Sequence, residues 1–295
     1  MAAYITANDF FKKKFGCKII KIPINGGFTC PNRDGSKGVG GCIFCSEKGS
    51  GDFLCPPETP IPEQFNRMRE IMHKKWKTGK YMIYFQSFTN TYAPIEKLRE
   101  MFTQAANLEN VVGISIATRP DCVTGKLLPL LSELSQKLYI TVELGLQTSN
   151  EKTAEYINRC YLNSDFDKAM EMLNKINIDV VCHIIFGLPE ETERDMINSV
   201  RYAAERGIKG IKIQLLHILK GTKLGEIYEK NPFKILTLEE YSSLVAAAIS
   251  VLPKDMVIHR ITGDGPKKIL IEPKWSANKK LVLNTINKKL SLYSQ

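Results

Sequence analysis

The feature that most constrains the fold of this chain is an alternation, from about residue 18 onward, of short β-branched or aromatic runs with longer amphipathic stretches. Such a pattern predicts parallel strands joined by crossover helices. The expected strands are 18–24, 81–86, 111–117, 138–146, 178–186 and 211–216, and the expected helices are 62–77, 94–106, 125–134, 165–176, 192–206 and 238–252. Six strand–helix units with right-handed crossovers make up most of a barrel. The predicted fold class is therefore α/β, a partial (β/α)6 TIM-like barrel.

The two ends of the chain differ in charge from its middle. Lys and Arg number 41 against 31 Asp and Glu, a net charge of +10. Residues 1–29 hold five Lys and one Asp, and residues 261–295 hold seven Lys, one Asp and one Glu, so these segments carry +4 and +5. We expect a basic segment with the first strand at 1–29, the barrel at 30–260, and a basic C-terminal extension at 261–295 that packs on the barrel as strand, turn and helix. The lysines fit either solvated surfaces or a polyanion-binding footprint.

The hydropathy of the chain predicts no passage through a membrane. The longest uncharged apolar runs, 180–188 and 244–252, reach about half of the ~20 residues that a spanning helix requires. Residues 1–15 lack an apolar run followed by a cleavage site of small residues. We therefore expect a cytoplasmic protein. In that reducing compartment the eight cysteines predict metal or redox chemistry rather than a disulfide framework.

Five of the cysteines crowd the first fifth of the chain. Cys30, Cys42 and Cys45 follow the first expected strand in a Gly-rich loop, with the spacing C-x11-C-x2-C. Three thiolates on a loop can bind three irons of a four-iron cluster and leave one iron open to a ligand other than protein. The alternative is a four-thiolate zinc site that adds Cys55, although Cys55 has no C-x2-C partner of its own.

Five further segments carry a family resemblance. They are 49–53 (GSGDF), 84–92 (YFQSFTNTY), 114–121 (ISIATRPD), 142–148 (VELGLQT) and 183–189 (HIIFGLP). With a three-cysteine loop after the first strand of a predicted parallel barrel, the chain resembles the radical S-adenosylmethionine (SAM) superfamily. The last three segments resemble the branch that includes the elongator catalytic subunit. The whole set is similar to the small bacterial family called YtqA/YhcC-type, or MnmL, from about residue 10 to residue 260.

The resemblance implies an enzyme whose cofactors are one four-iron four-sulfur cluster and SAM. Cys30, Cys42 and Cys45 match the cluster ligands, and the open iron would bind the amino and carboxylate groups of SAM. Reduction of the cluster would then cleave SAM to methionine and a 5'-deoxyadenosyl radical. The expected residues on the SAM side are Gln86, Ser87, Thr89, Arg119, Glu143, Gln147, Arg159 and His183.

Individual roles follow from the positions that these residues match. Glu143 and Gln147 would face SAM, Arg159 would meet its carboxylate, and His183 would shape the pocket. Many relatives carry a Gly-Gly-Glu motif for the methionine amine after the second strand, and this chain lacks it. Backbone carbonyls or the hydroxyls of Ser87 and Thr89 would substitute. For each charged residue the alternative is a structural salt bridge or a polar cap.

The end of the sixth strand carries the expected substrate-side residues. Alternation places Lys212 and Gln214 on one face of the strand, with His217 and Lys220 at the mouth of the barrel. Arg260, after a strand-like segment at 256–259, would close the remaining gap. A pocket lined by Lys212, His217, Lys220 and Arg260 would prefer an anionic group. The alternatives are solvated charge for Lys220 and a structural ion pair for Arg260.

An anion-binding barrel with two lysine-rich ends suits an RNA substrate that carries a carboxylated base, which must leave its stack to be reached. The resemblance implies tRNA as partner, with conversion of the wobble 5-carboxymethylaminomethyl(-2-thio)uridine to 5-aminomethyl(-2-thio)uridine, and a low-potential electron donor of the ferredoxin or flavodoxin type. One alternative is a radical SAM reaction on a small carboxylated metabolite or a porphyrin precursor. The other is a non-catalytic zinc-bearing RNA-binding module.

Overall fold

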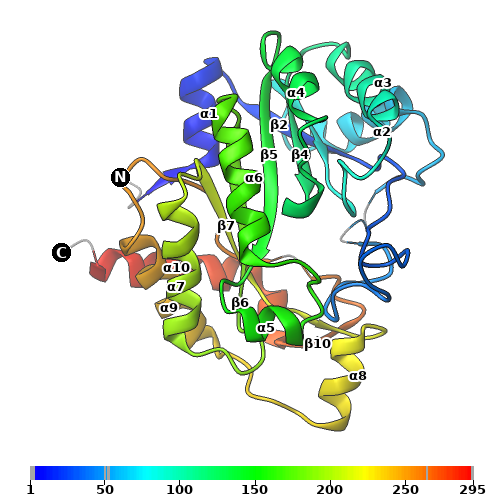
Figure 1. Ribbon diagram of the computed structural model, residues 1–295. Coiled ribbons are helices and arrows are strands. Elements are labelled where there is room, and N and C mark those ends of the chain that lie inside the picture. Colours follow the sequence, from blue (N-terminus) through cyan, green and yellow to red (C-terminus); the bar gives the residue numbers. More distant parts are fainter. Residues whose placement is uncertain (1–3, 50, 52–53, 264, 294–295) are drawn as a thin grey trace.

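The computed structural model describes residues 4–49, 51, 54–263 and 265–293, so part of the 49–53 segment lies outside the described residues. A curled sheet of eight parallel strands forms its centre, in the order β1-β9-β7-β6-β5-β4-β3-β2 (Figure 1). The six predicted strands are β2 (Ile19–Ile24), β3 (Lys80–Phe85), β4 (Val111–Thr118), β5 (Tyr139–Gln147), β6 (Asp179–Phe186) and β7 (Gly210–Leu215). The predicted partial TIM-like barrel is confirmed.

The helices that follow these strands cover the outer face of the sheet. They are α2 (Ile61–His73), α3 (Ile95–Ala106), α4 (Leu128–Ser135), α6 (Asn163–Lys175), α7 (Glu193–Glu205) and α9 (Leu238–Ser250). Polar caps set where several of them begin. The Thr192 hydroxyl, for example, accepts a hydrogen bond from the Asp195 backbone N–H at the start of α7, and the Asp195 carboxylate accepts one from the Thr192 backbone N–H in return. A short helix, α5 (Glu151–Tyr156), which the sequence pattern did not indicate, follows β5.

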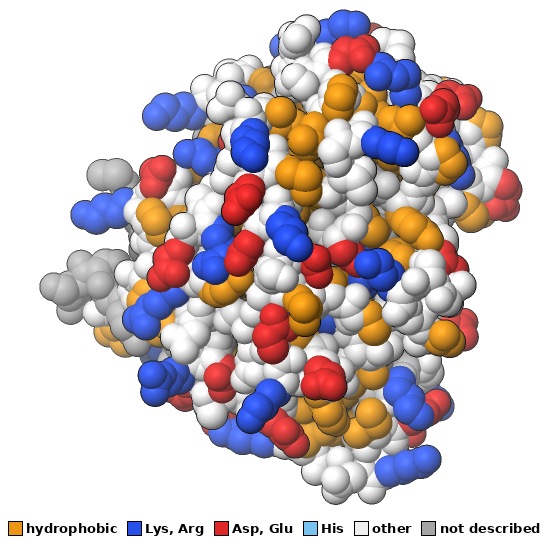
Figure 2. All heavy atoms as spheres, in the orientation of Figure 1, with side chains coloured by type: hydrophobic (Ala, Val, Ile, Leu, Met, Phe, Trp, Pro, Cys, Tyr) orange, Lys and Arg blue, Asp and Glu red, His pale blue; other side chains and the backbone are white. Residues whose placement is uncertain are grey.

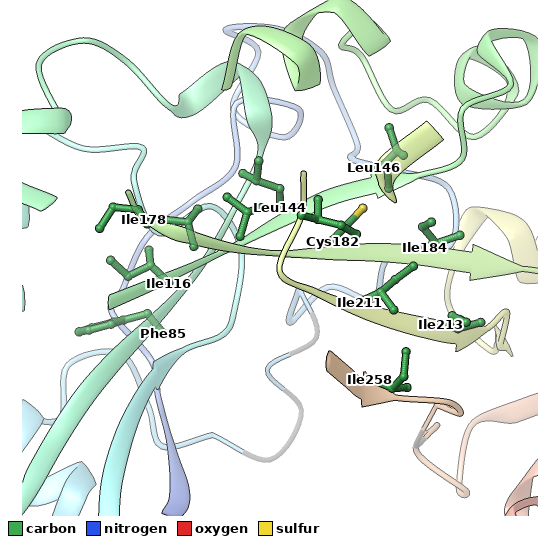
Figure 3. Packing of buried hydrophobic residues seen from close by; sticks show 14 of the residues in the cluster. Phe85, Ile116, Leu144, Leu146, Ile178, Cys182, Ile184, Ile211, Ile213 and Ile258 are labelled. Carbon is green, nitrogen blue, oxygen red and sulfur yellow. The ribbon is translucent and has the colours of Figure 1, made fainter. Parts of the chain in front are cut away.

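Alternation along the strands separates an apolar outer face from a polar inner face. In β6, Cys182 and Ile184 are buried among the outward-facing apolar residues, together with Leu144 of β5 and Ile213 of β7 (Figure 3). His183, between them, points the other way and contacts Glu143 of β5. The outer face therefore supplies the hydrophobic core, and the inner face remains available for chemistry.

The N-terminal segment closes one end of the barrel. Strand β1 (Ile5–Thr6) pairs with β9 (Val257–Arg260), and α1 (Ala7–Phe15) follows it at once. Phe11 of α1 is buried against Ile19 and Tyr139, the first residues of β2 and β5. Because these strands are parallel, α1 lies where they begin, at the end opposite their carboxyl termini. The lysines of α1 are therefore far from the mouth at which chemistry in such barrels takes place.

The C-terminal extension packs on the barrel as strand, turn and helix. It consists of β10 (Leu270–Glu272), which pairs with the short β8 (Ile218–Leu219), a 3-10 turn (Lys274–Ala277) and α10 (Lys279–Tyr293), which packs against α9. Trp275 anchors the turn, since its indole N–H donates to the Leu236 carbonyl at 3.0 Å and its ring lies 5.8 Å from that of Tyr241. A further helix, α8 (Lys223–Lys230), begins after β8.

The surface offers no simple electrostatic signature on the side that Figure 2 shows. Acidic and basic side chains alternate over that face, without one large area of either sign. None of the described helices combines the length and the hydropathy that a membrane crossing needs.

Candidate active site

The three cysteines lie in the loop that leaves β2 at the carboxyl end of the sheet. The Thr89 backbone N–H, from the loop after β3, donates to the Thr29 carbonyl at 3.1 Å and holds this loop over the mouth. Gly40 and Gly41 have φ angles of +81° and +80°, and a Cβ at Gly41 would lie 2.9 Å from the Arg33 Nε. Glycine at both positions therefore lets the chain turn tightly just before Cys42.

The thiols of this loop interact electrostatically. Burial and, to a smaller extent, the neighbouring charges of Cys45 and Cys30 raise the pKa of Cys42 to about 12, while Arg119 opposes the shift. A buried group of thiols needs a cationic partner to remain deprotonated. The three thiols and the arginine beside them are the donor set and the charge that an iron–sulfur cluster requires.

A buried asparagine supports the same interpretation. Asn32 is fully buried, its Nδ2 lies 3.7 Å from the Cys42 sulfur and 2.5 Å from the Asn158 carbonyl, and within the described part of the chain its Oδ1 has no hydrogen-bond partner. An amide aimed at a thiolate is typical of the surroundings of iron–sulfur clusters. No three His, Cys, Asp or Glu side chains of the described residues are grouped closely enough for a single metal ion, and this applies to Cys30, Cys42 and Cys45 as it does to Cys55.

Arg119, at the end of β4, lies beside the cysteine loop. Its guanidinium donates to both carboxylate oxygens of Asp121 at 2.9 Å, to the Arg159 carbonyl at 3.1 Å and to the Cys160 carbonyl at 3.0 Å, and it stacks on Tyr161. It also acts on the charges of Cys30 and Cys42. Arg119 is thus a positive charge, held in place by these contacts, that interacts electrostatically with the thiols of Cys30 and Cys42.

Arg159 has a different set of partners from the one that we expected. Its side chain is 0% exposed. The guanidinium donates to the carbonyls of Leu146, Thr148 and Tyr161, and to the side chains of Glu151 and Asn163. The structure therefore places Arg159 at the end of β5, where these contacts hold the following turn, and its expected contact with the SAM carboxylate stays a prediction.

The residues expected near the methionine end of SAM lie around the same mouth. The Ser87 hydroxyl donates to the Asn25 Oδ1 at 3.3 Å, and Ser87 and Thr89 are buried in the loop after β3. The Gln86 backbone N–H points to the Ile24 carbonyl of β2 at 3.5 Å. These contacts place the loop after β3 directly beside the loop that carries the cysteines.

Gln147 ends β5 in an unusual conformation. Its φ is +65°, and among the described contacts its buried Oε1 has no hydrogen-bond partner. A Cβ at Gly145 would lie 2.6 Å from the Gln147 Nε2, so glycine is needed for the side chain to fold back toward the barrel. A buried acceptor without a partner, on a strained residue at the mouth, is what a ligand-binding position looks like.

A charged floor lies deeper in the barrel, centred on Glu143. Its carboxylate contacts Lys21 Nζ at 2.8 Å and Ser115 Oγ at 2.7 Å through Oε1, and it contacts His183 Nε2 at 2.7 Å and the ammonium of Lys212 through Oε2. Because a carboxylate only accepts hydrogen bonds, His183 donates from Nε2. Glu143 therefore faces two lysines and a histidine in this structure.

Tyr84 of β3 completes this floor. The Lys212 ammonium donates to its hydroxyl at 3.1 Å, and the ammonium groups of Lys21 and Lys212 lie 4.9 Å and 4.6 Å from the centre of its ring. Gln214 lies 3.4 Å from the Nδ1 of His183. The floor thus combines side chains from six strands, β2 to β7.

The pKa shifts on this floor follow from burial and from the imbalance of charge. Burial alone would raise the pKa of Glu143, but Lys21, Lys212 and the hydrogen bond from His183 hold it well below its usual range. Burial lowers the pKa of Lys212 to about 7. The opposing effect of Glu143 is too small to restore the ordinary value, because Lys21 shares the same carboxylate. Burial and the charge of Lys212 lower the pKa of His183 to about 4. His183 is therefore neutral at pH 7.

The four expected substrate-side residues separate into two groups. Lys212 pairs in register with Arg260 at the end of β9, and the positive charge of Arg260 acts on Lys212 and His183. His217 lies instead against Gly263 and Gly265. Lys220 is exposed beside β8, and its backbone N–H donates to the Ile269 carbonyl. Among the contacts of the described residues, none brings the side chain of Lys220 to the floor.

Sequence reasoning missed Lys21, Tyr84, Ser115 and Asn32. Lys21 had a usable signal, since a lysine in the middle of an apolar strand, as in Ile20-Lys21-Ile22, must find a partner inside the protein. A hollow of about 570 Å³ beside the cysteine loop was also not foreseen; it is lined by Pro31, Ser36, Lys37, Thr91, Tyr92, Ala93, Pro94, Asp121, Cys122 and Thr124.

Family models match nearly the whole chain. A model of the radical SAM superfamily matches residues 27–218, and a model of the radical SAM C-terminal domain matches residues 208–291. Protein YtqA of Bacillus subtilis is 47% identical over 97% of this chain and 89% of its own length. Protein YhcC of Escherichia coli is 33% identical over 90% of this chain and 85% of its own length.

More distant proteins share the fold or part of the sequence. The solved structure of an archaeal Elp3 from Methanocaldococcus infernus superposes with a TM-score of 0.66 and 20% identity, over 92% of this chain and 63% of that one. A tRNA uridine(34) acetyltransferase of Methanocaldococcus jannaschii is 27% identical over 55% of this chain and 30% of its own length. Since a superfamily model covers most of the chain and a relative at 47% identity covers nearly all of it, the chain belongs to the radical SAM superfamily, whose members are enzymes that bind SAM on a four-iron four-sulfur cluster.

Proposed function

We propose that this radical SAM enzyme modifies the wobble uridine of tRNA, converting 5-carboxymethylaminomethyl(-2-thio)uridine to 5-aminomethyl(-2-thio)uridine. The observation that carries the proposal is the floor of the barrel, where Lys21 and Lys212 share the single carboxylate of Glu143. A carboxymethylamino group ends in the anion that such a floor attracts. The relationship to a tRNA uridine(34) acetyltransferase supports a tRNA uridine as the remainder of the substrate.

The cofactors would occupy the mouth above this floor. Cys30, Cys42 and Cys45 would hold the cluster, and Arg119 would balance its negative charge. When bound, the cluster and SAM supply a 5'-deoxyadenosyl radical. Gln147, whose buried Oε1 has no partner among the described contacts, would accept a hydrogen bond from SAM.

The protein's own residues would hold the substrate. The uridine would leave its stack, and its side chain would enter the mouth with the carboxylate directed toward the charged floor around Lys21 and Lys212. This orientation exposes the methylene between the amine and the carboxylate to the radical. Abstraction of one hydrogen atom there would give 5'-deoxyadenosine and a carbon radical next to the nitrogen. Loss of one electron from this radical to a one-electron acceptor, such as an oxidised iron–sulfur centre, would give an iminium. Addition of water would then break the carbon–nitrogen bond, release the carboxymethyl unit as glyoxylate and leave the aminomethyl group. A low-potential donor of the ferredoxin or flavodoxin type would reduce the cluster.

The test uses anaerobically reconstituted protein with SAM and dithionite, with and without tRNA that bears the carboxymethylaminomethyl group. Mass spectrometry of digested nucleosides and of 5'-deoxyadenosine gives the result. Aminomethyl uridine and matching 5'-deoxyadenosine are expected. If 5'-deoxyadenosine forms while the nucleosides stay unchanged, the substrate assignment is wrong.

One observation favours a second candidate, a small carboxylated metabolite. The lysines of α1 lie at the closed end of the barrel, so they do not extend an RNA-binding surface around the mouth. A small carboxylate would need only the charged floor. In that case tRNA would fail to stimulate SAM cleavage, whereas the proposed reaction requires that it does.

A further inference from the structure

The floor of the barrel holds more positive charge than its carboxylate can neutralise. Two ammonium groups, of Lys21 and Lys212, contact Glu143, and Arg260 lies within electrostatic range. The other titratable groups that face them are His183 and Tyr84, together with His259 below; burial lowers the pKa of both histidines and raises that of the tyrosine, so all three are neutral at pH 7. With Lys212 protonated, the floor holds two ammonium groups against one carboxylate. Burial lowers the pKa of Lys212 to about 7, and a bound anion would hold this lysine in its protonated form.

Hydrogen-bond counting identifies where that anion would bind. An ammonium group has three N–H donors. Lys21 directs two of them to Glu143 and to Ser115, the latter at 3.4 Å, and Lys212 directs two to Glu143 and Tyr84. Among the described contacts each lysine thus retains one N–H. The two ammonium groups are neighbours, because each contacts a different oxygen of the same Glu143 carboxylate and each lies within 5 Å of the centre of the Tyr84 ring.

Solvent reaches part of this layer. Side-chain exposure falls from 26% for Lys21 and 17% for His183 to 10% for Lys212 and 0% for Glu143. Two small residues stand beside the charged ones in the sheet, since Ala117 pairs in register with Glu143 and Gly145 with His183. Of the four charged or titratable side chains, Lys21 is the most accessible to an incoming ligand.

We propose that Lys21 and Lys212 form a carboxylate receptor in which Glu143 is the permanent counter-ion and the substrate carboxylate is the second one. Lys21, the more exposed lysine, determines the preference for a carboxylate over a neutral end of the same shape. The receptor adds to the proposed function the residues that recognise the carboxymethylamino end of the substrate. The identity of its natural ligand rests on that proposed function. A purely structural ion pair would show no such preference.

The experiment compares two substrates that differ only in charge. One is tRNA with the carboxymethylaminomethyl uridine, and the other carries the carboxamide in place of the carboxylate. For the wild type we expect the KM of the carboxylate substrate to be lower than that of the carboxamide by a factor of roughly ten or more. This is the difference in affinity that one charge-assisted hydrogen bond provides. Lys21→Met should abolish this ratio by raising the KM of the carboxylate substrate alone. Lys21→Arg, which keeps the charge, should retain most of it.

Lys18→Met is the matched control. Lys18 lies three residues earlier in the chain, where its ammonium contacts Asn8 and Trp76 outside the barrel, so the same loss of one charge should leave the ratio unchanged. Thermal unfolding verifies that each variant is folded. If Lys21→Met does not fold, Lys21→Gln, which keeps a polar side chain and Glu143 as the partner of Lys212, replaces it and should likewise lose the preference. A full carboxylate preference in any folded variant without the Lys21 ammonium overturns the receptor.

A binding measurement separates this inference from the proposed function. Titration of the reconstituted protein with N-ethylglycine and with N-ethylglycinamide, followed by NMR, needs no turnover. Binding of N-ethylglycine that requires Lys21, with no tRNA modification by the wild type, would support the receptor and refute the tRNA substrate. Modification of tRNA with the same preference for the carboxylate in the wild type and in Lys21→Met would support the tRNA substrate and refute the receptor. Equal binding of both compounds to wild type and Lys21→Met would refute the receptor directly.

Discussion

The ammonium of Lys21 and the carboxylate of Glu143 meet across the interior of the barrel, with Nζ 2.8 Å from Oε1. Their strands, β2 and β5, are separated in the sheet by β3 and β4, so the contact depends on the curling of the sheet. A buried pair of this kind adds little net stability in general, because both ions lose their hydration. Its position beneath the cysteine loop points instead to a role in binding.

Replacing Glu143 by Gln should destabilise the protein strongly. The substitution keeps the shape of the side chain but leaves Lys21 and Lys212 without their shared counter-ion. Loss of one partner of a buried ion pair costs about 3 kcal/mol or more in the free energy of unfolding. Urea unfolding measures the change.

The exposed pair of Glu63 and Arg67 on α2 provides the control for this experiment. Glu63→Gln should alter the free energy of unfolding by less than about 0.5 kcal/mol, because solvent screens such a pair. Equal effects of the two substitutions would contradict the charge balance inferred for the floor.

The stability of the protein should rise with pH above neutrality because of Lys212. Burial lowers its pKa to about 7 from an ordinary value of 10.5. Between these values the unfolded chain binds a proton that the folded chain has released, so the free energy of unfolding increases with pH, by at most about 1.4 kcal/mol per pH unit. Lys212→Met should lack this contribution. Urea unfolding at several pH values from 7 to 10 tests it, and parallel curves for the two proteins would exclude it.

The strands were predictable from sequence because parallel strands form long apolar runs that stand out between polar segments. Each predicted strand agrees with the observed one to within one residue at either end. The short elements could not be predicted from sequence. The pairing of Ile5–Thr6 with β9 and the closure of the barrel by Phe11 depend on contacts between residues far apart in the chain.

The partners of the polar residues were harder to foresee than their positions. The segments around Glu143 and Gln147 could be singled out, but the ion pairs of Glu143 join strands that are not neighbours in the sheet. Likewise, the donors of Arg159 face carbonyls exposed by a turn in which Asn158 and Cys160 have φ angles of +54° and +56°. No local pattern specifies such a turn.

Replacing Arg159 by Met should lower stability more than SAM binding. The guanidinium serves the carbonyls of Leu146, Thr148 and Tyr161 from a fully buried position, and removing it leaves those acceptors without donors. We expect a loss of about 2 to 4 kcal/mol in the free energy of unfolding, as buried unsatisfied groups produce. The Kd for SAM, measured by equilibrium dialysis at a temperature where the variant is folded, should change less than tenfold. A stable Arg159→Met variant that no longer binds SAM would show instead that Arg159 binds the SAM carboxylate.

An iron–sulfur cluster and a zinc site at the cysteine loop lead to different predictions for the metal content of cysteine variants. Ala in place of Cys30, Cys42 or Cys45 should abolish iron incorporation, because each of these thiols would bind one iron and together they form the electrostatically coupled group. Ala in place of Cys55 should leave the iron content, the visible absorbance and the reductive cleavage of SAM unchanged. A zinc site of four thiolates would instead lose its metal in all four variants. Metal analysis of the anaerobically reconstituted proteins therefore separates the two sites by the behaviour of Cys55 alone.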